Sequence, residues 1–325
     1  MVHALIIGAA GMVGRKLAEQ IAQEGSLNGK PLSKLSLVDI ITPAVPAGAP
    51  QDTSCSACDF SLEGEAEKLI ADRPEVIFLL AAIVSGEAEV DFDKGYRINL
   101  DGTRRLFEAI RAAGDDYCPR VVFTSSSAVF GTPFPDPIPD DYLAAPLTSY
   151  GVQKAMSELL LADYSRKGFL DGVGLRLPTI VVRPGKPNKA ASGFFSGIIR
   201  EPLNGQEALL PVADDVLHWM ASPRAAVGFH IHAAGVSGEA VGPRRSMTMP
   251  GLAVTVAEEI ETLQRFGGEK AVKLIRRERD PVIEKIVAGW PRSFAPTRAL
   301  ELGFKADDSF DAIVRAYIEE EGINV

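Results

Sequence analysis

Short apolar runs alternate with longer helical patterns through the first 185 residues of the chain. The short runs are typical of strands that are buried on both faces, and the longer patterns place their apolar residues along one side of a helix. The strand-like runs are 4–7, 35–38, 76–80, 121–123 and 173–177, and the helical patterns are 12–24, 63–72, 94–113 and 149–167. This alternation predicts the α/β class with a doubly wound parallel sheet.

The pattern changes after residue 183. The segment 184–215 is rich in Gly, Pro, Asn and Ser, the stretch 241–249 is interrupted again, and helical patterns return at 254–266 and 309–320. We therefore expect a nucleotide-binding Rossmann domain over 1–183 and a smaller, mainly substrate-binding lobe over 184–325. Some segments of that lobe are expected to interleave with the first domain and complete it.

A glycine-rich loop directly follows the first predicted strand and opens the first predicted helix. It reads G-A-A-G-M-V-G from residue 8 to residue 14. Glycines let the backbone turn tightly and approach a pyrophosphate, whose charge is stabilised at the helix N-terminus. Asp39 ends the second predicted strand, 25 residues beyond Gly14, close to the spacing of a ribose-binding acid. A carboxylate there repels a 2′-phosphate, which favours NAD over NADP, although Arg15 is a nearby cation.

Tyr150 and Lys154 are four residues apart and therefore lie on one face of a predicted helix. A run of hydroxyl side chains, 124–127, ends a predicted strand, and ligands of open α/β sheets bind at such strand ends. Oxidation of an alcohol by hydride removal also needs a base for the hydroxyl proton. A neighbouring ammonium lowers the pKa of a tyrosine toward that task, while a serine can hold the substrate oxygen. Asn99 could orient the lysine or a proton-relay water.

In their order and spacing these motifs resemble those of the extended short-chain dehydrogenase/reductases. The resemblance implies that Tyr150 is the catalytic base and that Lys154 lowers its pKa and binds the nicotinamide ribose. It implies that Asn99 belongs to the proton relay and that Ser126 carries the catalytic hydroxyl, with Ser125 as its nearest rival. Phe130 stands where the family usually has Tyr. A homodimer through the helices at 94–113 and 149–167 is also implied.

The same resemblance implies a set of NAD-binding residues along the carboxyl edge of the sheet. These are Gly8, Ala10, Gly11, Met12, Val13, Gly14, Asp39, Asp59, Leu80, Ala81, Ala82, Asn99, Tyr150, Lys154 and Pro178. Asp59 is expected to meet the adenine, or else to be an ordinary loop acid.

A second resemblance concerns the substrate. The segments 82–89 and 172–211 are similar to those of the bacterial NAD-dependent D-erythronate dehydrogenases, above all L-P-T-I-V-V-R-P-G-K-P-N at 177–188 and S-G-F-F at 192–195. The resemblance implies oxidation of the C2 hydroxyl of D-erythronate to 2-dehydro-D-erythronate in four-carbon acid-sugar catabolism. The substrate residues that we expect are Ser85, Ser126, Tyr150, Thr179, Arg183, Asn188 and Ser192.

A small hydroxy acid needs a cation or amide donors for its carboxylate. Arg183, Lys186, Asn188 and Lys189 cluster after the sixth predicted strand, and Arg is the better bidentate partner. Arg183 is therefore the first candidate, unless it pairs with an acid between the domains; the two lysines are expected to be solvated. Thr179 occupies a position where sugar-nucleotide epimerases have Asn, which counts against that alternative reaction. A non-catalytic NAD-sensing module is a second alternative, with less reason to keep Tyr, Lys and Ser together.

The composition argues against several other functions. Lys and Arg number 34 against 43 Asp and Glu, so the formal net charge of −9 gives no general attraction for nucleic acid or anionic lipid. The longest apolar run, 76–84, is about half the length of a membrane-spanning helix, and the N-terminus has no signal-peptide pattern. Three cysteines make no disulfide framework. We expect a cytoplasmic protein without nucleic-acid or membrane partners.

Metal-ligating residue types are present without the spacing of a metal site. Cys55 and Cys58 form a C-x-x-C that lacks a second pair or a nearby His, and structural zinc needs four ligands. His230 and His232 cannot share one face of the helix expected there. His218 is expected to pack in a core or interface, although it could also face the substrate cleft. We therefore expect no metal.

Overall fold

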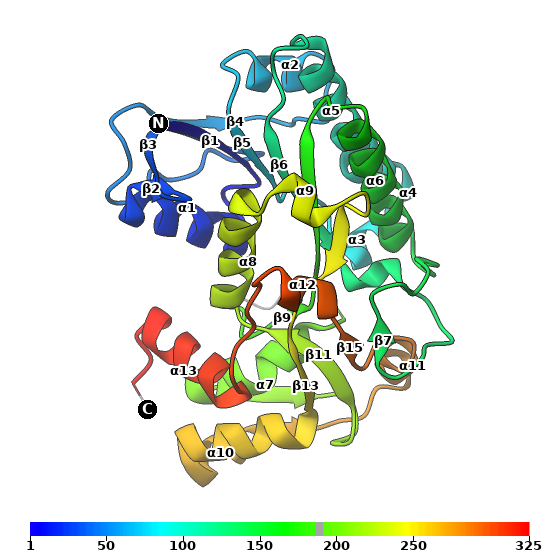
Figure 1. Cartoon of the computed structure of the whole chain (residues 1–325). Coiled ribbons are helices and arrows are strands. Elements are labelled where there is room, and N and C mark those ends of the chain that lie inside the picture. Colours follow the sequence, from blue (N-terminus) through cyan, green and yellow to red (C-terminus); the bar gives the residue numbers. More distant parts are fainter. Residues whose placement is uncertain (186–190, 325) are drawn as a thin grey trace.

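A computed structural model describes residues 1–185 and 191–324, and its centre is a twisted sheet covered by helices on both faces (Figure 1). The sheet has eight strands, and all of them pair in parallel except β2. From one edge to the other they are β12 (Ser246–Thr248), β8 (Asp171–Leu177), β6 (Arg120–Ser126), β5 (Val76–Leu79), β1 (Val2–Ile7) and β3 (Lys30–Asp39), with β2 (Ser26–Leu27) and β4 (Thr53–Ala57) both paired to β3. The predicted doubly wound α/β fold is confirmed.

Side chains of the central strands point alternately into two cores because successive residues of a strand face opposite sides. Ala4 and Ile6 pack with residues of α1 (Met12–Glu24) and α8 (Pro223–Gly235) on one face. Leu5 and Ile7 pack on the other face with residues of α2 (Glu65–Ile70), α5 (Thr103–Ala112) and α6 (Ser149–Arg166). Every residue of β1 is buried, which explains why all of them except His3 are apolar.

The segment after residue 180 builds a second core, in the lower half of Figure 1. Its main helices are α7 (Gly193–Leu203), α10 (Val256–Val272) and α13 (Phe310–Glu321). Its small sheets contain β9 (Thr179–Ile180), β11 (Leu217–Ala221) and β13 (Leu252–Thr255), then β10 (Ala208–Leu210) with β14 (Ile275–Arg277). A further short sheet pairs β7 (Ile138–Pro139) with β15 (Phe294–Ala295), and its Ile138 and Phe294 belong to a separate small cluster. Because α8 and β12 come from the same segment yet belong to the first core, the chain crosses between the two cores more than once. The boundary expected at residues 183 and 184 stays a prediction.

The helix expected over 94–113 has a more complex form. It begins as α4 (Phe92–Gly95), continues as a π-helical turn, η1 (Tyr96–Gly102), and only then becomes α5. Short π-helical turns occur often at functional sites, and this turn carries Asn99. The remaining short helices are α3 (Ser85–Val90), η2 (Ser127–Val129), α9 (Gly238–Val241), α11 (Pro281–Ala288) and α12 (Thr297–Glu301). Among the described residues, no helix has the length and apolarity needed to cross a membrane.

Candidate active site

The expected site residues gather at one edge of the sheet, where the parallel strands have their carboxyl ends. The glycine loop follows β1, Asp39 ends β3, Leu80 follows β5, Ser126 ends β6 and Pro178 follows β8. Parallel strands bring all these termini to the same side, where ligands of open α/β sheets bind.

The loop from 8 to 14 has the backbone geometry of a phosphate cradle. Gly8 has φ of 99°, a left-handed conformation that suits glycine. A Cβ there would lie 2.6 Å from the Ala81 nitrogen, so only glycine allows β1 and β5 to end this close together. The helix α1 starts after Gly11 with no side-chain cap and no acidic residue in its first turn. Its free N–H groups and the positive end of its dipole fit a pyrophosphate.

Asp39 lies against this loop from the neighbouring strand. Its carboxylate accepts hydrogen bonds from the backbone nitrogens of Ala10, at 2.9 Å, and Ile40, at 2.7 Å. Asp59 is held differently, because it pairs with Arg97 at 2.9 Å and also accepts from Ser61. Burial would raise the pKa of Asp59, but the hydrogen bonds from Ser61 and Arg97 outweigh it and lower the pKa. This pairing fixes the position of Asp59 without testing its expected contact with adenine.

Tyr150 is the second residue of α6, and two local features bring it to the end of β6. The Thr148 side chain caps the helix by accepting from the Gly151 nitrogen at 3.1 Å. Gly151 lies so close to the Ala128 carbonyl that any side chain there would collide with it. The helix can therefore begin directly beside the loop that follows Ser126, and Lys154 comes one turn later. The Lys154 ammonium donates to the Thr124 carbonyl at 2.8 Å and lies 5.7 Å from the centre of the Tyr150 ring.

Burial is the main influence on the pKa values of Tyr150 and Lys154. Burial raises the pKa of Tyr150 to about 12, while a hydrogen bond from Ser126 and the charge of Arg183 oppose the increase. Burial lowers the pKa of Lys154 to about 8, and the carboxylate of Glu158 opposes that change. The protein alone thus keeps the phenol protonated at neutral pH, so Tyr150 needs additional positive charge nearby before it can act as a base.

Strand alternation separates the two candidate serines. The Ser125 side chain is buried and donates to the Glu158 carboxylate at 2.5 Å. The Ser126 side chain points to the opposite side and is partly exposed. It accepts a hydrogen bond from the Ala128 nitrogen at 3.1 Å, and it also lowers the pKa of Tyr150. This arrangement favours Ser126 over Ser125 as the hydroxyl that faces the reaction.

The side chain of Asn99 is buried and fully hydrogen-bonded within the described part of the chain. Its amide nitrogen donates to the Ile83 carbonyl at 3.1 Å and to Gln153 at 2.8 Å, and its side-chain oxygen accepts from the Ile83 nitrogen at 2.9 Å. The backbone carbonyl of Asn99 accepts from Thr103 and Ser157. Within the described part of the chain no hydrogen bond joins Asn99 to Lys154. The amide instead fixes the segment after β5, next to Ala81 and Ala82.

Arg183 and Ser192 come together on the substrate side of the site. The Arg183 guanidinium donates to the Ile180 carbonyl at 2.8 Å and to the Ser192 hydroxyl at 3.3 Å. Burial lowers the pKa of Arg183, the charge of Arg200 adds to this effect, and Tyr150 acts in the opposite direction. No ion pair among residues 1–185 and 191–324 includes Arg183, so the described structure shows no interface acid that neutralises it.

Ser85 begins α3 and is partly exposed. Asn188 lies outside the described residues, as do Lys186 and Lys189.

The structure shows a contact between Thr179 and His218 that the sequence did not reveal. Thr179, in β9, has its hydroxyl 2.6 Å from Nε2 of His218, in the adjacent strand β11. Only the pairing of strands 39 residues apart brings these side chains together. His230 contacts Thr124 at 2.8 Å, and His232 contacts the Leu302 carbonyl at 2.8 Å, so the three histidines have separate partners.

A metal site needs several His, Cys, Asp or Glu side chains close together. The described residues contain no cluster of three or more His, Cys, Asp or Glu suited to a metal ion. Cys55 and Cys58 are unpaired thiols in that part of the chain. Burial raises the pKa of Cys58 to about 11, with the help of Glu65 and Asp59, which makes it a poor nucleophile.

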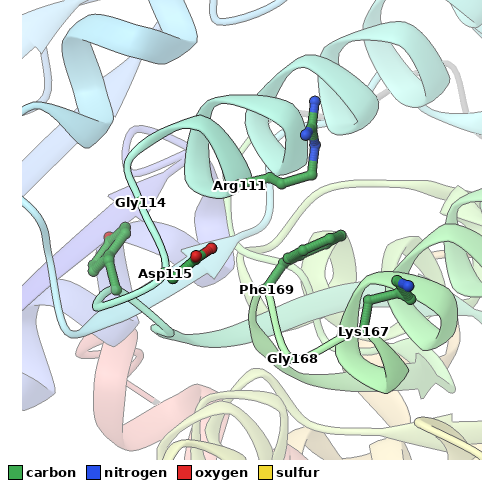
Figure 2. A pocket seen from close by; sticks show the side chains of 7 residues that line it. Arg111, Gly114, Asp115, Lys167, Gly168 and Phe169 are labelled. Carbon is green, nitrogen blue, oxygen red and sulfur yellow. The ribbon is translucent and has the colours of Figure 1, made fainter.

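A separate pocket lies away from the candidate site (Figure 2). It has a volume of about 230 Å³ and is lined by Arg111, Gly114, Asp115, Tyr117, Lys167, Gly168 and Phe169. Arg111 lies in the last turn of α5, and the other residues follow the C-terminal ends of α5 and α6 and precede β6 and β8. The pocket therefore lies at the amino edge of the sheet, opposite the glycine loop.

Comparisons with known proteins agree with this geometry. The NAD dependent epimerase/dehydratase family matches residues 4–220. This chain belongs to that family. A D-erythronate dehydrogenase from Cupriavidus necator is 47% identical over 325 residues, which cover 99% of each chain. A D-erythronate dehydrogenase from Haemophilus influenzae is 39% identical over 315 residues, which cover 97% of this chain and 98% of that one.

Solved structures show the same fold. A nucleoside-diphosphate-sugar epimerase from Agrobacterium tumefaciens has a TM-score of 0.97 and 61% identity, covering 99% of this chain and 95% of that one. A GalE-like L-threonine dehydrogenase from Cupriavidus necator has a TM-score of 0.82 with 21% identity, covering 98% and 99% of the two chains, which shows the fold alone. The segment that matches the family, residues 4–220, includes the glycine loop, Asp39, Ser126, Tyr150 and Thr179. The uncapped start of α1 and the carboxylate of Asp39 fit NAD, the cofactor of the family.

Proposed function

We propose that this protein is an NAD-dependent dehydrogenase that oxidises the C2 hydroxyl of D-erythronate to 2-dehydro-D-erythronate. The observation that carries the proposal is the position of Arg183, a guanidinium close enough to influence Tyr150 and without a carboxylate partner among the described residues. A 2-hydroxy acid has its carboxylate one bond from the reacting carbon, so it needs a cation beside the catalytic base. The two full-length relatives named as D-erythronate dehydrogenases support this substrate.

The side chains divide the work of the reaction. Arg183 binds the substrate carboxylate, and Ser126 holds the C2 oxygen against Tyr150. Tyr150 accepts the proton of the C2 hydroxyl on its phenol oxygen while the hydride leaves C2. Bound NAD⁺ supplies the hydride acceptor. Burial raises the pKa of Tyr150, and the charge of Arg183, with the Lys154 ammonium 5.7 Å from the ring centre, opposes this increase only in part. The positively charged nicotinamide ring would add the charge that favours the phenolate form, which is the form that accepts the proton.

Lys154 and Asn99 have supporting roles in this proposal. The Lys154 ammonium already points to the carboxyl end of β6, from which it can reach the nicotinamide ribose. Asn99 acts through the backbone of Ile83, since it holds the segment that contains Ala81 and Ala82 against the nucleotide site. Asp39 accepts from the adenosine ribose hydroxyls and repels a 2′-phosphate, which gives the preference for NAD over NADP.

A nucleotide-sugar epimerase is the second candidate, favoured by the similarity to the nucleoside-diphosphate-sugar epimerase from Agrobacterium tumefaciens. UDP-glucose 4-epimerases are less similar to this chain, for example 32% identical over 46% of it, or 24% identical over 91%. An epimerase returns the hydride to its substrate and releases no NADH, so net NADH formation separates the two reactions.

The deciding experiment is the formation of NADH from NAD⁺ with D-erythronate, L-erythronate, D-threonate and L-threonate. We expect selective turnover of D-erythronate. Tyr150→Phe should lower kcat by about 10²–10⁴-fold, the usual contribution of a positioned general base. Tyr164→Phe, on the same helix but bonded to Glu108, is the matched control and should keep wild-type activity. The proposal would be contradicted if none of the four acids led to NADH formation, or if wild type and Tyr150→Phe had equal rates.

We also propose that the protein is a cytoplasmic homodimer. The outer face of α6 exposes Leu159 and Met156, whose exposed fractions are 72% and 39%. A symmetric contact of α5 and α6 with a second copy would bury them, and three unpaired thiols suit a reducing compartment. Leu159→Glu should give a monomer in analytical ultracentrifugation; a wild-type monomer would refute the dimer.

A further inference from the structure

Thr179 and His218 form a buried polar pair beside the candidate substrate site. The Thr179 hydroxyl is 2.6 Å from Nε2 of His218, and Thr179 keeps part of its surface exposed. Thr179 begins β9, one residue after Pro178, at the carboxyl end of β8. Arg183 is close enough to influence both His218 and Tyr150 electrostatically. The pair therefore borders the same space as the base and the expected carboxylate partner.

The His218 ring is held rigidly by aromatic neighbours. Phe195, from α7, stacks on it with a centroid distance of 4.8 Å and an interplanar angle of 1°. Trp290, which follows α11, lies on it at 5.3 Å. The ring has 5% of its surface exposed. Burial lowers the pKa of His218 to about 3, so the imidazole is neutral at physiological pH.

A neutral imidazole has one N–H and one acceptor nitrogen, and its surroundings decide which is which. The Pro291 carbonyl lies near the ring and raises the pKa of His218, which means that it interacts favourably with an N–H. Nδ1 nevertheless has no hydrogen bond of normal geometry within the described part of the chain. Nε2 is therefore the hydrogen-bonded nitrogen of the ring, and its partner is the Thr179 hydroxyl. Whichever of the two atoms donates, this bond fixes the rotation of the Thr179 side chain.

We propose that His218 orients the Thr179 hydroxyl toward the substrate, where it forms a hydrogen bond with a non-reacting hydroxyl of a polyhydroxy acid. This inference rests on the proposed function of the site. A hydroxyl both donates and accepts, so Thr179 suits a substrate O–H, while the guanidinium of Arg183 is the better partner for a carboxylate. Arg183 and Thr179 thus divide the two ends of the substrate, with the carboxylate on the guanidinium and a C3 or C4 hydroxyl on the threonine.

The test combines enzyme variants with deoxy substrates. Thr179→Val removes the hydroxyl at nearly constant shape, and His218→Phe keeps the stack on Phe195 but removes the hydrogen-bonding nitrogen. Thr179→Ser and His218→Gln retain a hydroxyl and a hydrogen-bonding side chain, respectively. His232→Phe is the control, because His232 contacts Leu302 and Phe304 and none of the site residues. The substrates are D-erythronate and its 3-deoxy and 4-deoxy analogues, compared by kcat/KM with NAD⁺.

With D-erythronate, Thr179→Val and His218→Phe should each lower kcat/KM by about tenfold or more, the effect of one lost hydrogen bond in a closed site. With one of the two deoxy analogues the wild type should lose a similar factor, and these variants should lose nothing further. Thr179→Ser and His218→Gln should recover most of the activity. Equal losses on all three substrates would mean a purely structural role and would overturn the proposal, as would variants without any effect.

The outcome is separable from that of the proposed function. If wild-type enzyme does not oxidise D-erythronate, the proposed substrate is wrong. The hydrogen-bond proposal is then judged by binding of the same three acids to the enzyme–NADH complex, followed by NADH fluorescence. Weaker binding of one deoxy analogue to wild type, with the difference lost in Thr179→Val, supports it; equal binding of all three acids refutes it.

Discussion

The buried ion pair of Glu158 and Arg176 underlies the catalytic helix, and we predict that it dominates the stability of the site. The Arg176 guanidinium donates to both Glu158 oxygens, through Nε at 3.0 and 3.1 Å and through Nη2 at 2.7 Å. Ser125 donates to the same carboxylate. The exposed fractions of the two side chains are 7% for Glu158 and 13% for Arg176. The pair ties α6, which holds Tyr150 and Lys154, to β8.

Glu158→Gln keeps the size of the side chain and part of its hydrogen bonding but leaves the Arg176 charge buried without a counter-ion. Removing one partner of a buried pair costs about 3–5 kcal/mol, since the remaining charge keeps its desolvation cost. For a chain of this size that corresponds to a decrease in Tm of about 4–7 °C. Exchanging both partners, as in Glu158→Gln with Arg176→Met, should cost less than Glu158→Gln alone, because no unpaired charge is left.

The assay is urea unfolding followed by circular dichroism, with thermal melting as a second readout. The matched control is Asp163→Asn, which breaks the exposed pair of Asp163 and Arg166 on the same helix; the side chains there are 59% and 70% exposed. Such pairs contribute about 0–1 kcal/mol. If Glu158→Gln is no more destabilising than Asp163→Asn, or if the double variant is the worse one, the reasoning from burial is wrong.

Three further predictions concern the cofactor, the substrate and an unpaired acid. Asp39→Asn keeps an acceptor near Ala10 but removes the charge, so the NADP-to-NAD ratio of kcat/KM should rise by about tenfold or more; an unchanged ratio would contradict the role of Asp39. Arg183→Lys keeps the charge and loses the bidentate geometry, so KM for the acid should rise by about tenfold or more with a smaller change in kcat, and a change in kcat alone would argue against carboxylate binding. Glu259, in α10, is fully buried, its oxygens have no hydrogen-bond partner among the described residues, and burial raises its pKa well above the usual range. Because the folded state keeps the proton, Glu259 costs stability as the pH rises above the unfolded pKa of about 4.3. Glu259→Gln should thus stabilise the protein at pH 8 far more than at pH 4 in urea titrations.

Several parts of the candidate site depend only on residues that are close together in the chain, so the sequence was enough to predict them. The glycine loop, the acid that ends β3 and the Tyr150–Lys154 pair each depend on one turn or one strand end, and the alternation of strands and helices brings them to the same edge. Period-two alternation also separates Ser125 from Ser126, but only the structure shows which of them meets Glu158 and which faces Tyr150.

The sequence by itself determined the sheet, the glycine loop and the placement of Tyr150 and Lys154 on one helix face, because these follow from short-range periodicity and from residue types at fixed spacing. Only the tertiary structure decided that Asn99 holds Ile83, that Arg183 is close enough to act electrostatically on Tyr150, and that Thr179 is hydrogen-bonded to His218. The physical reason is that these contacts join segments distant in the chain. Which side chains meet there depends on strand pairing and helix packing that a one-dimensional pattern does not contain.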